Sequence, residues 1–369
     1  MKRICHITSM HKRYSTRIFQ KQCSSLAKNG YDVFLVVNDE KPDELIDGVH
    51  IVSTGFEPRN RKEIFIESKS KLFDKAIQID AEIYQLHDPD LIPLGMRLKR
   101  RGKKVIFDSH EDMPTLILDK KWIPKIFRSI ISGVYEIYEK RTLSKFDGLI
   151  SVTPHIVERL KKINKNTVMI TNYPIINKNV LSRNPKKQIC FAGGIGPQWC
   201  HYEILDAIEG IANIKYILAG RGSRDYIETL KKKPSWSKVE FVGFVNKKEV
   251  EKIYSESTIG MSVNYASQIE NEGTLGNNKL FEYMSAGMPV ICSNYKLWKE
   301  IVEDNNCGIC VDPKNSAQIK KAITTILNDP NMADTMGING RKVVEKKYNW
   351  SSQEVILTEF YDNIWYGWL

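Results

Sequence analysis

Short apolar runs alternate with longer amphipathic stretches along most of the chain. Up to residue 172 the short runs are rich in Val, Ile and Leu, a composition typical of buried strands. The longer stretches have helical spacing and separate consecutive runs, which predicts a parallel sheet with helices on both faces. The predicted strands are residues 3–8, 32–37, 50–53, 82–86, 104–108, 148–153 and 167–171, and the clearest helices are residues 16–28, 61–79 and 124–144.

The pattern pauses near residue 173 and then starts again. A polar stretch predicts a linker, and the alternation resumes with strands at residues 188–192, 215–219, 239–242, 259–263, 290–292 and 308–311. We therefore expect an α/β protein of two Rossmann-like, doubly wound parallel-sheet domains facing a cleft, with ligands beyond the carboxyl ends of the strands. The expected parts are a first domain at residues 1–173, a linker at 174–187, a second domain at 188–349 and an aromatic-rich helix at 350–369 that packs back on the first domain.

The length and composition limit the class of protein. A chain of 369 residues is too long for one ordinary core and agrees with two domains. No apolar run reaches the ~18 residues that span a bilayer, and the N-terminal run is too short for a signal peptide. The cysteines are scattered, and Cys307 and Cys310 form a C-x-x-C pair without a second pair to complete a zinc site. We expect a cytoplasmic protein that needs no metal or other cofactor.

The net charge of +11 favours polyanionic partners, namely nucleic acid, an anionic lipid surface or a phosphorylated ligand. The sequence contains no zinc finger, helix-turn-helix or aromatic RNA-binding motif, so no nucleic-acid partner is expected. Residues 120–131 mix Lys and Arg with Trp, Ile and Phe, and such a basic amphipathic segment could lie on an anionic membrane. The alternative is an ordinary domain helix whose apolar face packs in the core.

One short predicted helix carries a carboxylate among apolar neighbours. Asn277 or Asn278 can cap its start, and Gly287 suits the left-handed residue that follows a helix. Between them, Glu282 lies in a run of Leu, Phe, Tyr and Met, where an ionised carboxylate is costly unless it is hydrogen-bonded. The two hydroxyls of a ribose would suit it, because a carboxylate only accepts. The alternative is an exposed helix face or an ion pair with Lys279.

Small, glycine-rich turns follow the strands that precede this helix. Glycines at a strand end let a phosphate approach backbone N–H groups, although each such turn is a weak signal alone. Because the turns fall on one edge of the predicted sheet, together they indicate a nucleotide site. The residues in question are Gly193, Gly194, Gly220, Arg221, Phe244 and Val245.

These residues resemble a known family. The chain is similar over nearly its full length to retaining glycosyltransferases of family four, of surface-polysaccharide type, which have the GT-B fold. Residues 279–291, Lys-Leu-Phe-Glu-Tyr-Met-Ser-Ala-Gly-Met-Pro-Val-Ile, carry the most specific part of the resemblance. Further matching stretches are residues 11–19, 86–95, 108–112, 191–194, 218–220, 241–245, 307–313, 336–341 and 348–350.

The resemblance implies a hexosyltransferase that uses a nucleoside diphosphate sugar, most simply a UDP-sugar. It implies that Glu282 holds the ribose and that the diphosphate, which gains charge in the transition state, is stabilised by the preceding turn. In the family a histidine after a first-domain strand lies beside the transferred sugar, and His110 is the matching position. We expect His110, Lys279 and Glu282 to be the catalytic residues. The donor-binding turn before the helix corresponds to Thr274, Leu275, Gly276, Asn277 and Asn278.

The acceptor side of the resemblance lies in the first domain. The family's acceptor loop follows the first strand, where His11, Arg13 and Arg17 stand, and His87 is counted with them although its turn with Asp88 is typical of a structural residue. The implied acceptor is a saccharide or an undecaprenyl-linked glycan of the capsule or O-antigen type. The alternative for the loop is a solvated basic face. The alternative for His110 is a structural histidine beside the preceding aspartate.

Two features depart from the family pattern. Residues 195–201 contain no Arg or Lys, whereas many members carry a diphosphate clamp there. Thr274 stands where many members have a first glutamate, although Glu270 and Glu272 lie nearby. We expect Arg221 and Lys279 to supply the missing positive charge.

Three other functions remain open from the sequence. The missing clamp and glutamate agree with a non-catalytic partner protein that keeps the fold and binds a nucleotide sugar. The net charge of +11 agrees with a nucleic-acid binder or a nucleic-acid-directed sugar transferase. A sugar-nucleotide epimerase of the same architecture would need catalytic carboxylates in the cleft and no acceptor.

Overall fold

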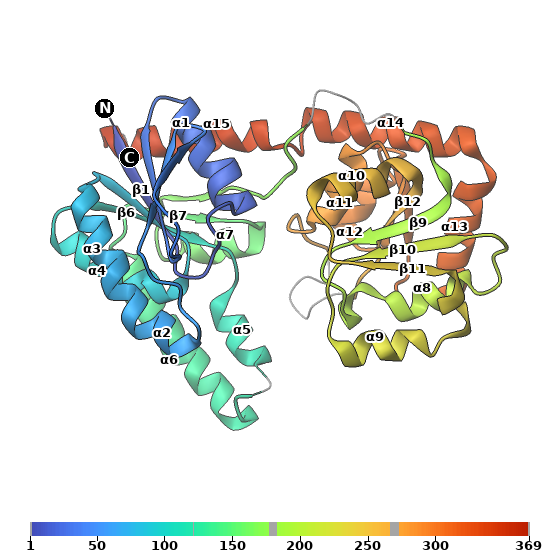
Figure 1. The fold of residues 1–369 in the computed structure, drawn as a ribbon, viewed down its shortest axis with the longest axis horizontal. Coiled ribbons are helices and arrows are strands. Elements are labelled where there is room, and N and C mark those ends of the chain that lie inside the picture. The colour runs from blue at the N-terminus through green and yellow to red at the C-terminus, as the bar shows by residue number, and fades with distance from the viewer. Residues whose placement is uncertain (1, 121, 177–182, 266–272, 368–369) are drawn as a thin grey trace. The chain divides into compact units, whose positions relative to one another are not determined.

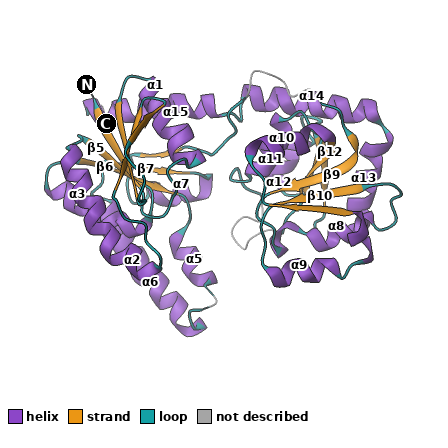
Figure 2. Cartoon of the chain, in the orientation of Figure 1, coloured by secondary structure: helices purple, strands orange, loops and turns teal. Residues whose placement is uncertain are grey.

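The computed structural model describes residues 2–120, 122–176, 183–265 and 273–367 (Figure 1). The chain divides into two compact units, Met1–Asn172 with Ser351–Leu369, and Tyr173–Trp350. Each unit is a sheet covered by helices, and Figure 2 shows strands and helices alternating in both. The two doubly wound sheets predicted from the sequence are confirmed.

The first unit contains an eight-stranded sheet with the order β3-β4-β2-β1-β5-β6-β7-β8. All pairs are parallel except that of β3 with β4. The strand order reverses between β1 and β5, and the carboxyl ends at such a point are where doubly wound sheets bind ligands. The strands are β1 Arg3–Ile7, β2 Asp32–Val37, β3 Glu44–Ile46, β4 Val49–Ser53, β5 Ile83–Leu86, β6 Lys104–Ser109, β7 Gly148–Ser151 and β8 Thr167–Met169.

Helices cover both faces of this sheet. A π-helical segment, Thr16–Cys23, leads into α1, and a second one, Ile64–Ser68, joins α2 to α3. Strand β3 was not predicted, yet residues 47 and 48 are Asp-Gly with positive φ at both, a hairpin signal that the sequence offers. The helices are α1 Ser24–Lys28, α2 Arg61–Glu63, α3 Lys69–Ile79, α4 Ile92–Arg100, α5 Met113–Asp119, α6 Lys125–Leu143, α7 Pro154–Lys161 and α15 Trp350–Tyr366.

The C-terminal helix α15 packs on the first unit. Its Phe360, Tyr361 and Ile364 are buried, and a Cβ added at Gly148 would lie 2.4 Å from Cζ of Phe360. Nζ of Lys104 donates to the carbonyls of Ile364 and Trp365, so a cation caps the helix end. The helix therefore completes the core of the unit in which the chain begins.

The second unit contains a six-stranded parallel sheet with the order β11-β10-β9-β12-β13-β14. This order reverses between β9 and β12, the arrangement of dinucleotide-binding sheets. The strands are β9 Lys186–Ala192, β10 Lys215–Ala219, β11 Val239–Gly243, β12 Ser257–Ser262, β13 Val290–Ser293 and β14 Gly308–Val311. The helices are α8 His201–Ile208, α9 Arg224–Lys231, α10 Lys247–Glu256, α11 Asn278–Ser285, α12 Lys296–Val302, α13 Ser316–Asn328 and α14 Pro330–Lys346.

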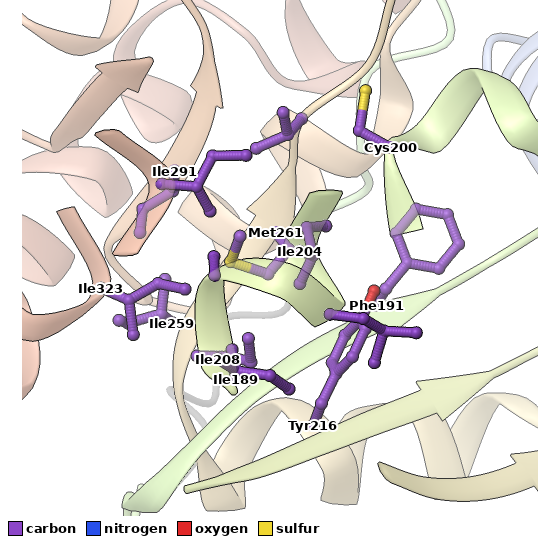
Figure 3. Close-up of a cluster of buried hydrophobic side chains, with 14 of the residues drawn as sticks. Ile189, Phe191, Cys200, Ile204, Ile208, Tyr216, Ile259, Met261, Ile291 and Ile323 are labelled. Carbon is purple, nitrogen blue, oxygen red and sulfur yellow. The ribbon is translucent and has the colours of Figure 1, made fainter. Parts of the chain in front are cut away.

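Alternate residues of these strands enter two cores, one on each face of the sheet. Ile189 and Phe191 of β9 pack against α8 and α13 in the cluster drawn in Figure 3. Cys190 and Ala192 point to the other face, where they meet α10, α11 and α12. The period of two along a strand therefore buries both faces and leaves the strand ends to carry function.

The predicted linker is corrected where the structure describes it. Arg183 donates to the carbonyls of Gly287 and Ser257, and β9 begins at Lys186 instead of residue 188. Residues 183–187 thus belong to the second unit, held by backbone acceptors that hydrophobicity patterns do not reveal. Residues 177–182 of the predicted linker lie outside the described residues.

Candidate functional site

The glycine turns of the second unit meet at the carboxyl edge of its sheet. The backbone N–H of Gly193 donates to the carbonyl of Ala219, and that of Gly220 donates to the carbonyl of Gly243. Gly220 has a φ of +135°, and a Cβ there would lie 1.7 Å from the carbonyl oxygen of Gly193. Only glycine fits this contact, so the turns after β9, β10 and β11 form one continuous edge.

The side chain of Lys279 crosses this edge. A Cβ added at Gly193 would lie 2.2 Å from Cε of Lys279, so the glycine makes room for the lysine. Nζ of Lys279 also lies 3.6 Å from Oε2 of Glu282, one turn further along α11. The structure therefore brings together the turn, the cation and the carboxylate that the sequence indicated.

Glu282 does not face the core, which corrects the expectation of a carboxylate held in an apolar setting. Leu280, Phe281 and Met284 occupy the buried side of α11, and 39% of the Glu282 side chain is exposed on the opposite side. There Oε2 accepts a hydrogen bond from the hydroxyl of Tyr254 at 3.1 Å. The alternative ion pair with Lys279 is present, and the carboxylate remains open to further donors.

Tyr254 had no sequence motif to mark it. It is buried, and burial, followed by the charge of Glu282, raises the pKa of its hydroxyl well above the ordinary value. The hydroxyl therefore keeps its proton and acts as a fixed donor that orients Glu282.

The turn before α11 is held by side chains from neighbouring elements. Nε1 of Trp298 donates to the carbonyl of Thr274 at 2.9 Å, and Oγ1 of Thr274 accepts from the N–H of Gly276. Asn277 is the helix cap: its Oδ1 accepts from the N–H of Leu280. Its Nδ2 donates to a strand serine, Ser262. The buried side chain of Asn277 is thus used within the fold, so that only backbone atoms of this residue remain for a ligand.

The other residues of this edge are exposed to different degrees. Leu275 and Asn278 are half-buried, and the N–H of Asn278 donates to the carbonyl of Gly276. Gly194 is exposed beside the half-buried Gly193. Glu270 and Glu272, considered as substitutes for the missing first glutamate, lie outside the described residues.

Arg221 and Phe244 form a pair on the same edge. The guanidinium carbon of Arg221 lies 4.3 Å from the centroid of the Phe244 ring, a cation–π contact, and both side chains are exposed. Val245 beside them is half-buried. The pair offers a flat surface and a positive charge to a ligand.

Residues 195–201 supply no positive charge to this edge. His201 is buried against the hydroxyl of Tyr216 at 2.8 Å, and burial lowers its pKa to about 3. Trp199 packs against Phe191 in the core. The cations that the described turns carry are therefore Lys279 and Arg221.

A second polar cluster lies at the carboxyl ends of β1, β5 and β6 in the first unit. Asp108 is buried at its centre and accepts from Arg17 through two hydrogen bonds, of 3.0 and 2.7 Å, and from Gln22 at 2.8 Å. Burial favours a higher pKa, but Arg17 and His110 outweigh it and hold the pKa of Asp108 well below its usual value. Asp108 is therefore a fixed anion.

Two histidines flank this anion. Nδ1 of His87 and Nε2 of His110 each lie 3.3 Å from Oδ2 of Asp108. Burial outweighs the aspartate at His87 and lowers its pKa to about 4, so His87 is neutral near pH 7. His110 is the partly exposed member of the pair and the one that can reach a substrate.

The cluster continues through the sheet to the C-terminal helix. Nε2 of His87 lies 2.9 Å from Nδ1 of His6, and Nε2 of His6 lies 3.2 Å from the hydroxyl of Tyr361 on α15. That hydroxyl also donates to Gln85. His6 and Gln85 interrupt otherwise apolar strands, a signal that sequence reasoning passed over.

His11 is the other accessible histidine beside this cluster. Its ring centroid lies 5.2 Å from that of His110, and its Nε2 lies 3.6 Å from Oδ1 of Asp88. Asp88 in turn accepts from Thr8 and from the N–H of Ser9, which fixes the loop after β1. His11 and His110 therefore present two imidazoles side by side.

The other three residues predicted to bind the acceptor are corrected. All five donors of Arg13 go to Asp39, Glu44 and two carbonyls. Arg17 is buried in its pair with Asp108, and His87 has no exposed side-chain surface. These three side chains are buried beneath the surface of the site and support it. The alternative of a solvated basic face is also wrong for both arginines, because they are buried.

The ligand atoms of His87, Asp108 and His110 lie within 4.8 Å of one another, close enough to consider a metal ion. The oxygens of Asp108 already accept from Arg17 and Gln22, and a guanidinium repels a metal cation. The residues fit an ion-pair cluster better than a metal site.

The two cysteines of the C-x-x-C pair have different partners. Sγ of Cys310 lies 3.5 Å from Sγ of Cys292, while the thiol of Cys307 donates to the carbonyls of Ile301 and Val302.

Two family models match adjoining parts of the chain. Residues 16–172 match "Glycosyltransferase Family 4", and residues 173–343 match "Glycosyl transferases group 1". A stretch of 175 residues is 31% identical to an uncharacterized glycosyltransferase of Methanocaldococcus jannaschii. That match covers 46% of this chain and spans 43% of the relative's length.

Solved structures with low sequence identity resemble the whole chain. A sucrose-phosphate synthase from Thermosynechococcus elongatus is 18% identical, with a TM-score of 0.72 and full coverage of both chains. The Anabaena protein HepE, in complex with UDP-glucose, is 14% identical, with a TM-score of 0.69 and coverage of 98% and 99%. At these identities the likeness shows the fold alone.

Proposed function

Since the chain is a glycosyltransferase of the GT-B fold, we propose that it transfers a sugar from a UDP-sugar to a saccharide acceptor. The observation that carries the proposal is the edge formed by Gly193, Gly220, Lys279 and Glu282 in the second unit. It offers close backbone approach, one cation and one open carboxylate, which are the groups that a nucleoside diphosphate needs. The resemblance to HepE with UDP-glucose supports uracil as the base.

Each residue of the edge has a proposed role. Glu282, oriented by Tyr254, accepts hydrogen bonds from the two ribose hydroxyls. Lys279 lies beside Gly193 and neutralises the diphosphate, replacing the clamp that residues 195–201 lack. Arg221 with Phe244 provides a face for the base and a second cation.

The proposed reaction retains the configuration of the sugar. The bond between the anomeric carbon and the diphosphate oxygen breaks, and the acceptor oxygen bonds to the same face of that carbon. The leaving diphosphate takes the acceptor proton, so no protein base is needed at the anomeric carbon. Lys279 favours this step because negative charge on the diphosphate grows in the transition state.

His110 is proposed to contact the transferred sugar. It is the exposed member of the polar cluster that includes Asp108 and His87. Its Nε2 lies 3.3 Å from Oδ2 of the buried Asp108. The anion orients the ring, so that the opposite edge is presented to a hydroxyl. His11, 5.2 Å away between ring centroids, is proposed to help bind the acceptor.

The acceptor is proposed to be a growing surface glycan, saccharide or undecaprenyl-linked, of the capsule or O-antigen type. The protein would then work at the inner face of the plasma membrane. Within the described residues, no helix is both long enough and apolar enough to cross a bilayer.

A thermal-shift screen with UDP, GDP and their sugars tests the donor proposal. A ligand at about 100 times its Kd stabilises the folded protein by roughly 2.7 kcal/mol, which raises the Tm measurably. We expect a shift with UDP and UDP-sugars and a smaller one with GDP. No shift with any nucleotide would contradict a nucleotide site.

A turnover assay separates this function from the non-catalytic alternative, which the absence of Arg and Lys from residues 195–201 favours. Hydrolysis or transfer of a UDP-sugar in the presence of candidate acceptors is the expected result. Binding of UDP-sugar without hydrolysis or transfer would instead support a nucleotide-sugar-binding partner protein.

A further inference from the structure

Helix α6 presents its apolar side chains outward. Figure 1 shows α5 and α6 extending beyond the sheet of the first unit. The buried residues of α6 are Ser132, Glu139 and, in its last turn, Leu143, and Glu139 pairs with Arg159. This arrangement is the reverse of an ordinary surface helix, whose apolar face packs on the core.

The exposed apolar side chains form a continuous stripe. They follow helical spacing along one side of α6. Trp122 precedes the helix and is 73% exposed, and Ile126 in the first turn is 75% exposed. A 19-residue helix is roughly 28 Å long at ~1.5 Å per residue. We call this surface the α6 stripe, and its members are Trp122, Ile126, Phe127, Ile130, Ile131, Val134, Ile137 and Tyr138.

The sequence allowed two interpretations of residues 120–131, a membrane-surface segment or an ordinary domain helix whose apolar face packs in the core. The structure excludes the second. The core of the unit does not contain this apolar face, because Ile126, Phe127 and Ile130 are exposed. A contiguous apolar surface of this length on a folded protein marks a site of interaction. The next question is which partner binds this apolar surface.

Charge at both ends of the stripe selects an anionic partner. Lys120 and Lys125 are exposed at its start, and Lys140 and Arg141 are exposed at its end. The exposed acids nearby are Asp119 and Glu136, fewer than the cations. An apolar face between cations, with a tryptophan at one end, has the composition of a helix that lies in a membrane interface.

A second copy of the chain fits this surface less well. In an antiparallel pair of α6 helices, Lys125 of one copy would face Arg141 of the other, and in a parallel pair each cation would face its equivalent. Either arrangement sets like charges together beside the apolar contact. The headgroups of an anionic bilayer carry a charge opposite to that of the cations at both ends of the stripe.

We propose that the α6 stripe docks the first unit on an anionic lipid bilayer, with α6 lying in the plane of the interface. Apolar side chains enter the acyl boundary and the flanking lysines and Arg141 contact the headgroups. The proposal deepens the proposed function, since it would bring the protein to a lipid-linked acceptor, but its test needs no donor, acceptor or turnover.

Vesicle sedimentation tests the docking with the full chain. We expect retention on phosphatidylglycerol–phosphatidylcholine vesicles at low salt and little retention on phosphatidylcholine alone. The triple variant Ile126→Ser, Ile130→Ser, Ile137→Ser should lower the partition coefficient about tenfold or more, because apolar burial drives interfacial binding. The pair Lys125→Glu, Lys140→Glu should lower it by a similar factor on anionic vesicles only.

The matched control is Ile338→Ser in the second unit. Ile338 and Ile137 are both 55% exposed, so the control removes one equally exposed isoleucine outside the α6 stripe and should leave retention unchanged. All the replaced side chains are exposed, and unchanged Tm values would show that the variants are folded. If the triple variant does not fold, the charge pair still tests the proposal.

Three results would overturn it. One is no retention of wild-type protein on anionic vesicles at low salt, and another is retention that neither variant lowers. The third is a wild-type dimer in solution that the triple variant converts to monomer, because the stripe would then bind a second copy. A protein that turns over UDP-sugar and gives any of these results keeps the proposed function and loses only the docking surface.

Discussion

The variant Asp108→Asn tests whether the buried anion supports the first unit. Asp108 accepts two hydrogen bonds from Arg17 and one from Gln22, and none of its surface is exposed. Asparagine keeps the size but removes the charge. The Arg17 guanidinium would then be left buried without its counter-ion.

The expected loss is large because the pair is fully buried. Breaking a buried ion pair by removing one partner costs about 3–5 kcal/mol. For a unit of this size, each kcal/mol lowers the Tm by about 2–4 °C, so the first unit should melt roughly 6–20 °C lower. Calorimetry at pH 7 measures this loss. Because the pKa of Asp108 is lower in the folded protein than in the unfolded chain, its contribution to the free energy of unfolding is complete above the unfolded-state pKa. That contribution is lost only as the pH falls through the folded-state pKa.

Asp80→Asn is the matched control. Asp80 pairs with Lys103 at the surface, and its left-handed backbone also suits asparagine. We expect no change in Tm for this variant. A shift of less than about 2 °C for Asp108→Asn, similar to the control, would show that Arg17 is satisfied by other groups and would refute the reasoning.

Three further predictions concern the second unit. Tyr254→Phe removes the donor to Glu282 and should weaken UDP binding by about 5–30-fold with kcat less affected, as a titration would show; unchanged affinity would remove Tyr254 from the site. Gly193→Ala places a Cβ on the flexible end of Lys279, so donor affinity should fall while the Tm stays near wild type, and a large loss of Tm would contradict this. His201 is buried neutral with its pKa lowered from 6.5 to about 3, so its contribution to stability is present above pH 6.5 and is lost as the pH falls toward 3. His201→Gln should therefore flatten the fall of Tm over that range, and an unchanged slope would contradict it.

The elements were predictable because periodicity reports burial directly. Strands such as Asp32–Val37 and Lys215–Ala219 have the predicted bounds, since continuous apolar runs in a parallel sheet have no other place to lie. The hairpin at Asp47 and Gly48 does not show in the hydrophobic pattern because β3 is only three residues long. The linker was overextended because Arg183 binds backbone carbonyls, which leave no mark on hydrophobicity.

The site was predictable where its chemistry depends on local spacing. The glycine turns and the Lys279–Glu282 spacing on one helix are visible in the sequence, and the structure brings them together at the proposed nucleotide-binding edge. Arg13 and Arg17 were misassigned because charge says nothing of burial, and their partners stand far away in the chain. Tyr254 and Tyr361 reach the sites from other elements, so no motif could include them.

The central claim is that Lys279 and Glu282 hold a nucleoside diphosphate, and calorimetric titration of UDP tests it most directly. Lys279→Ala should raise the Kd by about tenfold or more, since a charge-assisted contact to phosphate is lost, and Glu282→Gln should also weaken binding. Lys314→Ala, an exposed lysine of the same unit, should leave the Kd unchanged. A Kd that Lys279→Ala and Glu282→Gln leave at the wild-type value would contradict the account.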